Sequence, residues 1–546
     1  MNAPLRNQLP DPIGEAFATR WAARHVDGAT LDRDLTLEAD VVIVGTGAGG
    51  GTTAEILAEA GLGVILLEEG ALRTSREFQL EERLAYPALY QESAGRKTSD
   101  HGIGILQGRT VGGSTVVNWT TSLRTPEPTL RHWREAHGLT SFTPEALAPW
   151  FAQRERRLAI APWPTAPNRQ NALLRDGARA LGLAPEVLPR NVRGCWNLGY
   201  CGMGCPTNAK QSMLVTTIPA AMDRGARLLS RLRAERLEHA RGRVTALVAH
   251  PLDEWNQVRR TVTVTLRARH YVLAGGAIGT PALLLRSHAP DPYQRAGART
   301  FLHPSVLSAA LMPEPVDPFA GAPQSICVDD DLWPTTGEMG FKLEVPAVHP
   351  LIASVVIGDF GAAHRHYLHR MNHWFVVVAL LRDGFHPESA GGQVRLDGYG
   401  DPVLDYPLTD YLWAGARRAF HRMADLQFAV GAKTVLPLHL DARAASAAAA
   451  AHALIDALPL RARRTRVVSA HVMGGAALAP DERGGVVRPD GVHHQLENLS
   501  VHDGSLLPTS LGVNPQLTIY ALTAWLATQL AVRLRPATDA APHPPA

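Results

Sequence analysis

The most constraining feature of this sequence is a glycine-rich turn that follows a short, β-branched apolar run. Residues 40–44 read DVVIV, a pattern typical of a strand buried on both faces, and they lead directly into GTGAGGG at residues 45–51. Residues 52–60 then have the pattern of a helix that Gly61 would end, and residues 63–67 form a second predicted strand. The sequence therefore predicts a βαβ unit that opens a parallel sheet.

This unit has the composition of a dinucleotide-binding site. Gly45 permits the tight turn, Gly47 lets the backbone approach a pyrophosphate, and Gly50 lets the helix and strand pack closely. The N-terminus of the helix offers free N–H groups to the phosphates. Glu68 follows the second strand, where a carboxylate accepts ribose hydroxyl protons, and an acid at this position argues against NADP. The unit alone leaves the choice between FAD and NAD open.

Three further segments settle that choice through a family resemblance. They are GRTVGGSTVVNW at residues 108–119, LAGGAIGTPALL at 273–284, and SAHVMGG at 469–475 with the later Asp503-Gly504 and the GVNP at 512–515. With the dinucleotide motif, in this order and spacing, they resemble the glucose–methanol–choline (GMC) family of FAD oxidoreductases over about residues 35–533. Within that family the sequence looks most like the long-chain (fatty) alcohol oxidases, through Asn118-Trp119, Arg124 and CGMGCPTNAKQS at residues 201–212.

The resemblance implies an α/β fold, in which an FAD-binding Rossmann-like (GMC) domain is joined to a second, α+β substrate domain built on an antiparallel sheet. Strand-like runs over residues 227–273 and at 374–381 agree with this, whereas residues 127–190 show no strand pattern. We expect a lead-in at 1–38, FAD-binding segments at 39–125, 200–311 and 465–533, substrate-domain segments at 126–199 and 312–464, and a disordered tail at 534–546.

The resemblance also implies roles for individual residues. His471 and Asn514 would be the catalytic pair, and no metal ligands are expected. Val117 stands where relatives with a covalently linked flavin carry a histidine, so we expect non-covalent FAD. The expected cofactor-binding residues are Gly45, Gly47, Gly50, Glu68, Gly112, Gly113, Ser114, Asn118, Asp503, Gly504 and Asn514.

Several of these residues have a purely structural alternative. Asn118 could be a turn amide, Asp503 a loop cap and His471 a core histidine. Asn514 precedes Pro515 and a predicted helix, so its amide could cap that helix instead of contacting a substrate.

The implied activity is the oxidation of an alcohol, apolar and either long-chain or alicyclic, to an aldehyde or ketone. Hydride would pass to flavin N5 and His471 would take the hydroxyl proton. The electron acceptor, O2 or a quinone or cytochrome, is not encoded in any motif. A GMC-type lyase with a redox-idle FAD and a non-catalytic FAD-binding partner protein stand as alternatives.

Composition excludes other classes of protein. With 54 basic and 51 acidic residues, the chain has no charge excess that would point to nucleic acid. Four cysteines in 546 residues do not make a disulfide scaffold. The first forty residues lack a secretory signal pattern, and residues 517–532 fall short of a bilayer span. We therefore expect a cytoplasmic protein, with contact to a membrane surface left open.

Two clusters resemble metal sites without meeting their requirements. Three thiols lack a fourth ligand at suitable spacing and predict a structural loop, in which a redox-sensitive pair stays open: Cys195, Cys201 and Cys205. The histidine-rich HRHYLHRMNHW at residues 364–374 predicts an exposed basic–aromatic loop. With the neighbouring aromatic residues from Phe360 to Phe375, that loop could cover an apolar substrate entrance or contact a membrane.

Overall fold

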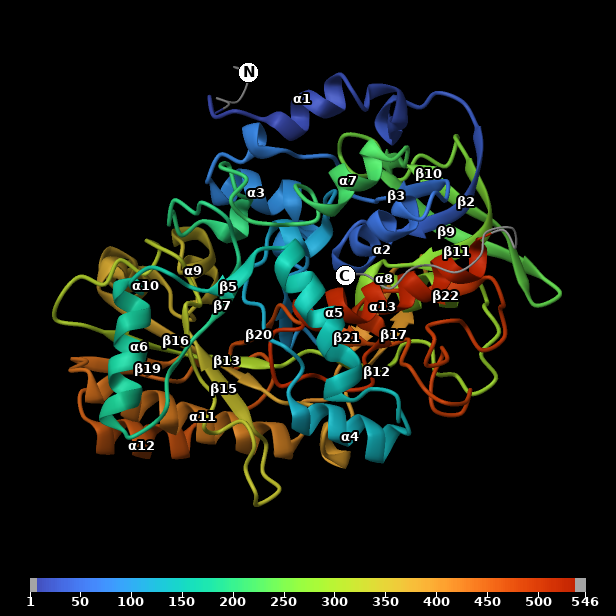
Figure 1. Ribbon diagram of the computed structural model, residues 1–546. Coiled ribbons are helices and arrows are strands. Elements are labelled where there is room, and N and C mark those ends of the chain that lie inside the picture. Colours follow the sequence, from blue (N-terminus) through green and yellow to red (C-terminus); the bar gives the residue numbers. More distant parts are fainter. Residues whose placement is uncertain (1–6, 536–546) are drawn as a thin grey trace.

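The computed structural model describes residues 7–535, and the predicted βαβ unit lies in an eight-stranded sheet (Figure 1). The strand order is β1-β8-β3-β2-β11-β10-β9, and β22 pairs with β11. Strands β3, β2 and β11 are parallel neighbours, whereas β9, β10 and β11 form an antiparallel meander. The bounds are β1 His25–Asp27, β2 Leu35–Val44, β3 Val64–Leu67, β8 Arg227–Ser230, β9 Leu232–Ala240, β10 Arg243–Pro251, β11 Val264–Leu273 and β22 Leu499–Val501.

The unit β2–α2–β3 has the predicted order, with longer elements. Strand β2 begins at Leu35 and not at residue 40, because it pairs with β11 along its whole length. Helix α2 (Ala48–Glu59) begins inside the glycine run. A Cβ atom at Gly49 would lie 1.7 Å from the carbonyl oxygen of His502, and one at Gly50 would lie 1.9 Å from that of Gly45. Only glycine permits this close approach of helix and strand.

The lead-in contributes more to the fold than its polar composition predicts. Its residues His25–Asp27 form β1, an edge strand parallel to β8. Helix α1 (Pro12–Ala18) and the turn after it bury Phe17 and Trp21 in the main core. Residues 1–6 of the predicted lead-in, and 536–546 of the predicted tail, lie outside the described residues.

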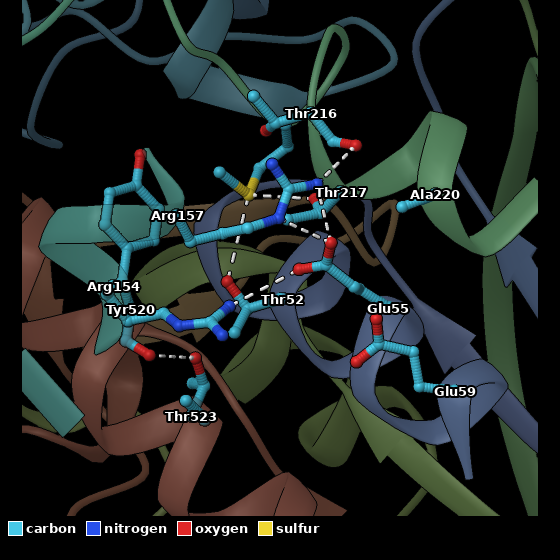
Figure 2. A network of polar contacts seen from close by, with 12 residues as sticks. Thr52, Glu55, Glu59, Arg154, Arg157, Thr216, Thr217, Ala220, Tyr520 and Thr523 are labelled. Carbon is cyan, nitrogen blue, oxygen red and sulfur yellow. Dashed lines mark hydrogen bonds and ion pairs between the residues drawn. The ribbon is translucent and has the colours of Figure 1, made fainter. Parts of the chain in front are cut away.

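A buried ion cluster attaches the dinucleotide helix to α5 (Pro144–Arg157) (Figure 2). Glu55 on α2 accepts a hydrogen bond from Arg157 Nε at 2.7 Å and from Arg154 Nη1 at 3.4 Å. Arg157 also donates to the carbonyl oxygen of Thr216 at 3.0 Å. The side chains of Glu55 and Arg154 are only 4% and 6% exposed, so each compensates the other's lost hydration.

A second eight-stranded sheet carries the other half of the molecule, and it is mostly antiparallel as predicted. Its order is β4-β20-β13-β16-β15-β14-β6, with β19 paired to β13. The bounds are β4 Ile103–Ile105, β6 Glu186–Val187, β13 Ser305–Leu311, β14 Ile326–Val328, β15 Phe341–Glu344, β16 Trp374–Leu381, β19 Thr434–Pro437 and β20 Val467–Ser469. A four-stranded sheet contains β18 Pro402–Asp405, β17 Gly392–Leu396, β12 Ala298–Phe301 and β21 Met473–Gly474, and a two-stranded sheet contains β5 Ile160–Pro162 and β7 Pro189–Asn191.

These sheets depart from the expected domain segments at three strands of the second sheet and also in the four-stranded sheet. The latter joins β12 and β21, from segments assigned to the FAD-binding domain, to β17 and β18, from a substrate-domain segment. Strands β4, β13 and β20 belong to the second sheet, although their residues lie in segments that we assigned to the FAD-binding domain. The segment 127–190 also contains short strands that its composition does not predict. The borders of the two domains therefore stay a prediction.

Helices cover both sheets. Helix α11 packs on β13 and β16 of the second sheet, and α13 packs on α2 and α5 beside the first sheet. The remaining helix bounds are α3 Glu82–Leu89, α4 Glu127–His137, α6 Arg169–Ala180, α7 Thr217–Asp223, α8 Gly276–Arg286, α9 Pro350–Val356, α10 Gly361–His369, α11 Asp410–Ala429, α12 Ala448–Ala457 and α13 Gln516–Leu534.

Helix α13 is long and apolar enough to cross a membrane by length and composition, contrary to our expectation for residues 517–532. In this fold 61% of its most apolar window is buried against the rest of the protein, as in a core helix. Burial of this helix explains its composition without a membrane.

Candidate active site

Almost all of the predicted site residues line a single cavity of about 1010 Å³. Two do not line it: Gly50 is in the contact between helix and strand, and Gly112 donates its N–H to Thr46 Oγ1 at 2.9 Å. The structure brings to the cavity Gly45, Gly47, Glu68, Gly113, Ser114, Asn118, His471, Asp503, Gly504 and Asn514. Its volume is at the upper end for small-molecule and cofactor sites, as a dinucleotide requires.

Two glycine turns line part of the cavity. Gly45 and Gly113 adopt positive φ angles of 101° and 55°, which side chains rarely tolerate. A Cβ at Gly113 would lie 2.8 Å from Gly47 Cα. At Gly47 such a Cβ would make only one contact within 4 Å, with Gly113 Cα at 3.9 Å, so this face of the glycine is not crowded. A phosphate-bearing ligand can therefore approach the backbone here, as the motif predicts.

Glu68 connects these turns. Its Oε2 accepts hydrogen bonds from the Thr46 amide at 3.0 Å and hydroxyl at 2.6 Å, and its Oε1 accepts one from the Gly70 amide at 2.9 Å. Burial raises the pKa of Glu68, against the effect of these donors. Oε1 accepts only one of these hydrogen bonds and therefore retains a lone pair for a ligand hydroxyl, whereas Oε2 accepts two.

Asp503 and Asn118 both line the cavity, as predicted, and both also make structural hydrogen bonds. Asp503 accepts hydrogen bonds from the amides of Gly276 and Ser505 at 2.8 Å each, so its carboxylate is a loop cap while its residue lines the cavity. Burial raises the pKa of Asp503. Asn118 Nδ2 donates to Gln516 Oε1 at 2.7 Å, which connects the turn after residue 113 to the start of α13.

His471 and Asn514 meet at the wall of the cavity, where His471 Nε2 lies 3.4 Å from Asn514 Nδ2. The alternative in which Asn514 caps α13 is wrong, because the N-cap position is Pro515 and no side chain caps this helix. His471 is half-buried at the cavity wall. Its loss of hydration lowers its pKa to about 4, with Glu344 opposing the effect and Lys342 adding to it. His471 is therefore neutral at physiological pH.

A buried ion pair that the sequence analysis missed orients Asn514. Lys342 Nζ lies 2.7 Å from Glu344 Oε1 and donates to Asn514 Oδ1 at 3.1 Å, and Asn514 Nδ2 lies 3.4 Å from Glu344 Oε2. Burial works toward the neutral amine, but the attraction and hydrogen bond of Glu344, together with Cys327 and Asp329, outweigh it and raise the pKa of Lys342. Gln324, which lines the cavity, also donates to Glu344. The sequence FKLE at residues 341–344 could have indicated this pair, because it places two charged side chains on one face of an otherwise apolar strand.

His303 is a second missed residue. It has a left-handed φ of 45°, and the carboxylate of Asp383 accepts hydrogen bonds from its amide at 3.2 Å and from the Leu302 amide at 3.0 Å. Its Nδ1 lies 3.2 Å from Nδ1 of His471, and its Nε2 accepts a hydrogen bond from the Gly512 amide at 3.0 Å. Burial lowers the pKa of His303 well below its usual value. Neutral His303 then carries its proton on Nδ1 and donates to His471, whose own proton lies on Nε2. In this tautomer the 3.4 Å contact between His471 Nε2 and Asn514 Nδ2 brings two N–H groups together and is not a hydrogen bond.

The cysteine cluster and the histidine-rich segment both resembled metal sites in the sequence. Cys195, Cys201 and Cys205 are half-buried free thiols. Residues 7–535 contain no group of three or more His, Cys, Asp or Glu side chains that could hold a metal. The predicted histidine-rich loop is wrong, because residues 361–369 form helix α10. Trp374 and Phe375 are buried in β16, whereas Phe360 is 87% exposed. Contact of this region with a membrane or a substrate entrance stays a prediction.

The fold and the cavity together define a dinucleotide-binding protein with a second, antiparallel-sheet domain over its site. Two GMC oxidoreductase sequence profiles match residues 86–305 and 387–523. The chain belongs to the GMC oxidoreductase family. It is an oxidoreductase, and its cofactor is FAD.

Individual relatives agree with this assignment. An uncharacterized GMC-type oxidoreductase of Sinorhizobium fredii is 31% identical over 501 residues, which cover 91% of this chain and 95% of the relative. A long-chain-alcohol oxidase of Arabidopsis thaliana is 27% identical over 533 residues, covering 93% and 71%. The solved structure of a formate oxidase from Aspergillus oryzae matches with a TM-score of 0.66 at 16% identity, covering 91% of this chain and 99% of that one, and supports the fold.

Proposed function

We propose that this protein oxidises an apolar alcohol, long-chain or alicyclic, to the aldehyde or ketone. The observation that carries the proposal is the meeting of His471 and Asn514 at the cavity wall, with Nε2 and Nδ2 3.4 Å apart. FAD supplies the hydride acceptor for this chemistry, at flavin N5. The residues of the chain must then hold the substrate oxygen and take its proton.

Asn514 is suited to hold the oxygen. Lys342 donates to its Oδ1, which leaves the Nδ2 group directed toward Glu344 and His471. An N–H donor at this position would fix the hydroxyl group so that its C–H bond points toward the hydride acceptor.

His471 is suited to take the proton at Nε2, because its neutral ring is the form that a base requires. In the resting arrangement Nε2 itself carries the ring proton. Accepting a proton there requires the other tautomer, in which His471 Nδ1–H donates to His303 Nδ1 and His303 releases the Gly512 amide. The proposal therefore includes a tautomeric exchange of this histidine pair.

The expected cofactor residues are proposed to hold FAD without a covalent bond. Gly45, Gly47 and Gly113 would face its phosphates, Glu68 its ribose and Asn118 its reactive edge. Val117, at the position of the linking histidine in some relatives, is 6% exposed and has no nucleophilic group. Acid precipitation of the yellow protein should therefore release the colour into the supernatant, and a pellet that stays yellow would contradict this.

An apolar substrate is favoured by the residues beside the catalytic pair. Trp119, Val472 and Ile519 line the same cavity. The Arabidopsis relatives, named as long-chain-alcohol oxidases, are consistent with such a substrate.

An anaerobic alcohol panel tests the activity and separates it from its rivals. Alcohols that are substrates should bleach the flavin absorbance, whereas a lyase with redox-idle FAD or a non-catalytic FAD-binding protein would leave it unchanged. Repeating the panel with O2 and with an artificial acceptor then identifies an oxidase or a quinone- or cytochrome-linked dehydrogenase.

A further inference from the structure

Lys210 is a buried lysine that the proposed chemistry does not use. Its side chain is buried beneath the turn that contains Asn118, and its residue is 3% exposed. Its Nζ donates to the carbonyl oxygens of Val116 at 2.7 Å, Asn118 at 2.6 Å and Cys201 at 2.7 Å. All three ammonium hydrogens are therefore engaged by backbone, and two of them hold the same short segment.

Arg190 holds the next residues of that segment. It is 1% exposed, and it donates to the carbonyl oxygen of Trp119 at 3.0 Å and to Thr120 Oγ1 at 2.7 Å. Asn118, Trp119 and Thr120 line the cavity. Two buried cations thus lie directly behind one wall of the FAD site.

Neither cation has a carboxylate partner within residues 7–535, in contrast to Lys342, which pairs with Glu344. The charged and titratable neighbours of Lys210 are the thiols of Cys201, Cys205 and Cys195 and the guanidinium of Arg190. Arg190 stacks on Trp163 with its Cζ 4.9 Å from the ring centroid and donates to Cys201 Sγ at 3.7 Å. Carbonyl dipoles and an aromatic ring stabilise these cations without cancelling their positive charge, which favours negative charge nearby.

We propose that Lys210 and Arg190 form a cationic clamp, which fixes residues 116–120 against FAD and favours the negative charge that a hydride carries into the cavity. The proposal rests on FAD as the cofactor and does not depend on which substrate delivers the hydride. It also gives a role to the cysteine-containing segment, because Cys201 supplies the third carbonyl of the clamp.

The clamp has a pH dependence. Burial lowers the pKa of Lys210 to about 8, against the opposing effect of the three thiols. Because the ammonium form provides the charge and the third N–H, the clamp is complete below pH 8 and weakens as the pH rises through that value. Other groups face this site: burial raises the pKa of Cys195 and of Tyr90, which donates to the carbonyl oxygen of Gly202.

The test measures FAD binding and reduction potential without any alcohol, so it is independent of the proposed substrate. Apoprotein is titrated with FAD, and the holoprotein is equilibrated with redox dyes, for the wild type, Lys210→Met and Lys210→Arg. Lys433→Met, at an exposed lysine, is the matched control. Lys210→Met should bind FAD at least about tenfold more weakly, since it loses charged hydrogen bonds, and should have a lower reduction potential. The control should match the wild type.

The pH series needs no variant and decides the matter even if Lys210→Met does not fold. FAD affinity of the wild type should fall as the pH rises through about 8, and Lys210→Arg should remove this change. Three results would each overturn the proposal. One is a wild-type FAD affinity that does not change from pH 7 to about 9.5, and another is a Lys210→Met protein with unchanged affinity and potential. The third is a pH-dependent change in affinity that persists in Lys210→Arg and so belongs to the thiols.

Discussion

Two buried acidic side chains, Glu55 and Glu344, have similar chemistry and different consequences. Each lies in the interior and pairs with a buried cation, Arg154 in one case and Lys342 in the other. Glu55 joins α2 to α5 (Figure 2), and none of its partners lines the cavity. Glu344 and Lys342 contact Asn514, which does line it. A buried charge therefore marks a functional site only when its hydrogen bonds end on groups that face the cavity.

Matched glutamate-to-glutamine changes test this comparison, and Glu55→Gln should have the larger effect on stability. It leaves Arg154 buried without a counter-ion, which should cost about 3–5 kcal/mol of unfolding free energy. Denaturant unfolding measures this cost. The rate of flavin reduction in the folded variant should match the wild type, and a loss of rate comparable to that of the second variant would break the comparison.

Glu344→Gln should act on the chemistry instead. Without the carboxylate, Lys342 is an unpaired buried cation and Asn514 Nδ2 loses the charged acceptor that helps to fix its amide. A misplaced orienting group costs about 10²-fold in rate. Anaerobic stopped-flow reduction with a substrate alcohol measures this directly, and FAD content serves as the control. Wild-type reduction by a folded, FAD-loaded Glu344→Gln protein would show that this pair is only structural.

The pH profile of flavin reduction tests the protonation state of His471. Burial lowers the pKa of His471 to about 4, so the ring stays neutral, and able to act as a base, down to that pH. Between pH 7.5 and 5.5 the rate should change by less than about twofold, whereas a histidine of ordinary pKa would lose about tenfold. A tenfold loss over this range would show that the surroundings of His471 do not hold its ring in the neutral form.

The sequence predicts the parts of this protein that depend on local pattern. The strand–glycine turn–helix unit, the strand at residues 374–381 and the convergence of the motif residues on one cavity all agree with expectation. The side-chain pairs of the site that the sequence does not predict depend on long-range contacts. His303 and His471 are 168 residues apart and Lys342 and Asn514 are 172 apart, so no local spacing marks either pair.

Two local errors have equally specific causes. Charged and aromatic residues at 364–374 suggested a loop, yet α10 packs Tyr367 and Leu368 against a small apolar cluster and leaves the polar side chains outside. The short strand at residues 25–27 forms only because β8 offers it a parallel edge, and three residues are too few to show a pattern.

The most direct test of the account is the rate of flavin reduction in His471→Ala. Removal of a positioned general base costs about 10²–10⁴-fold in rate. The variant should therefore stay folded and yellow while anaerobic reduction by the best alcohol of the panel slows by about that factor. Reduction of the His471→Ala flavin at the wild-type rate across the whole panel would contradict the central claim that this residue takes the alcohol's proton.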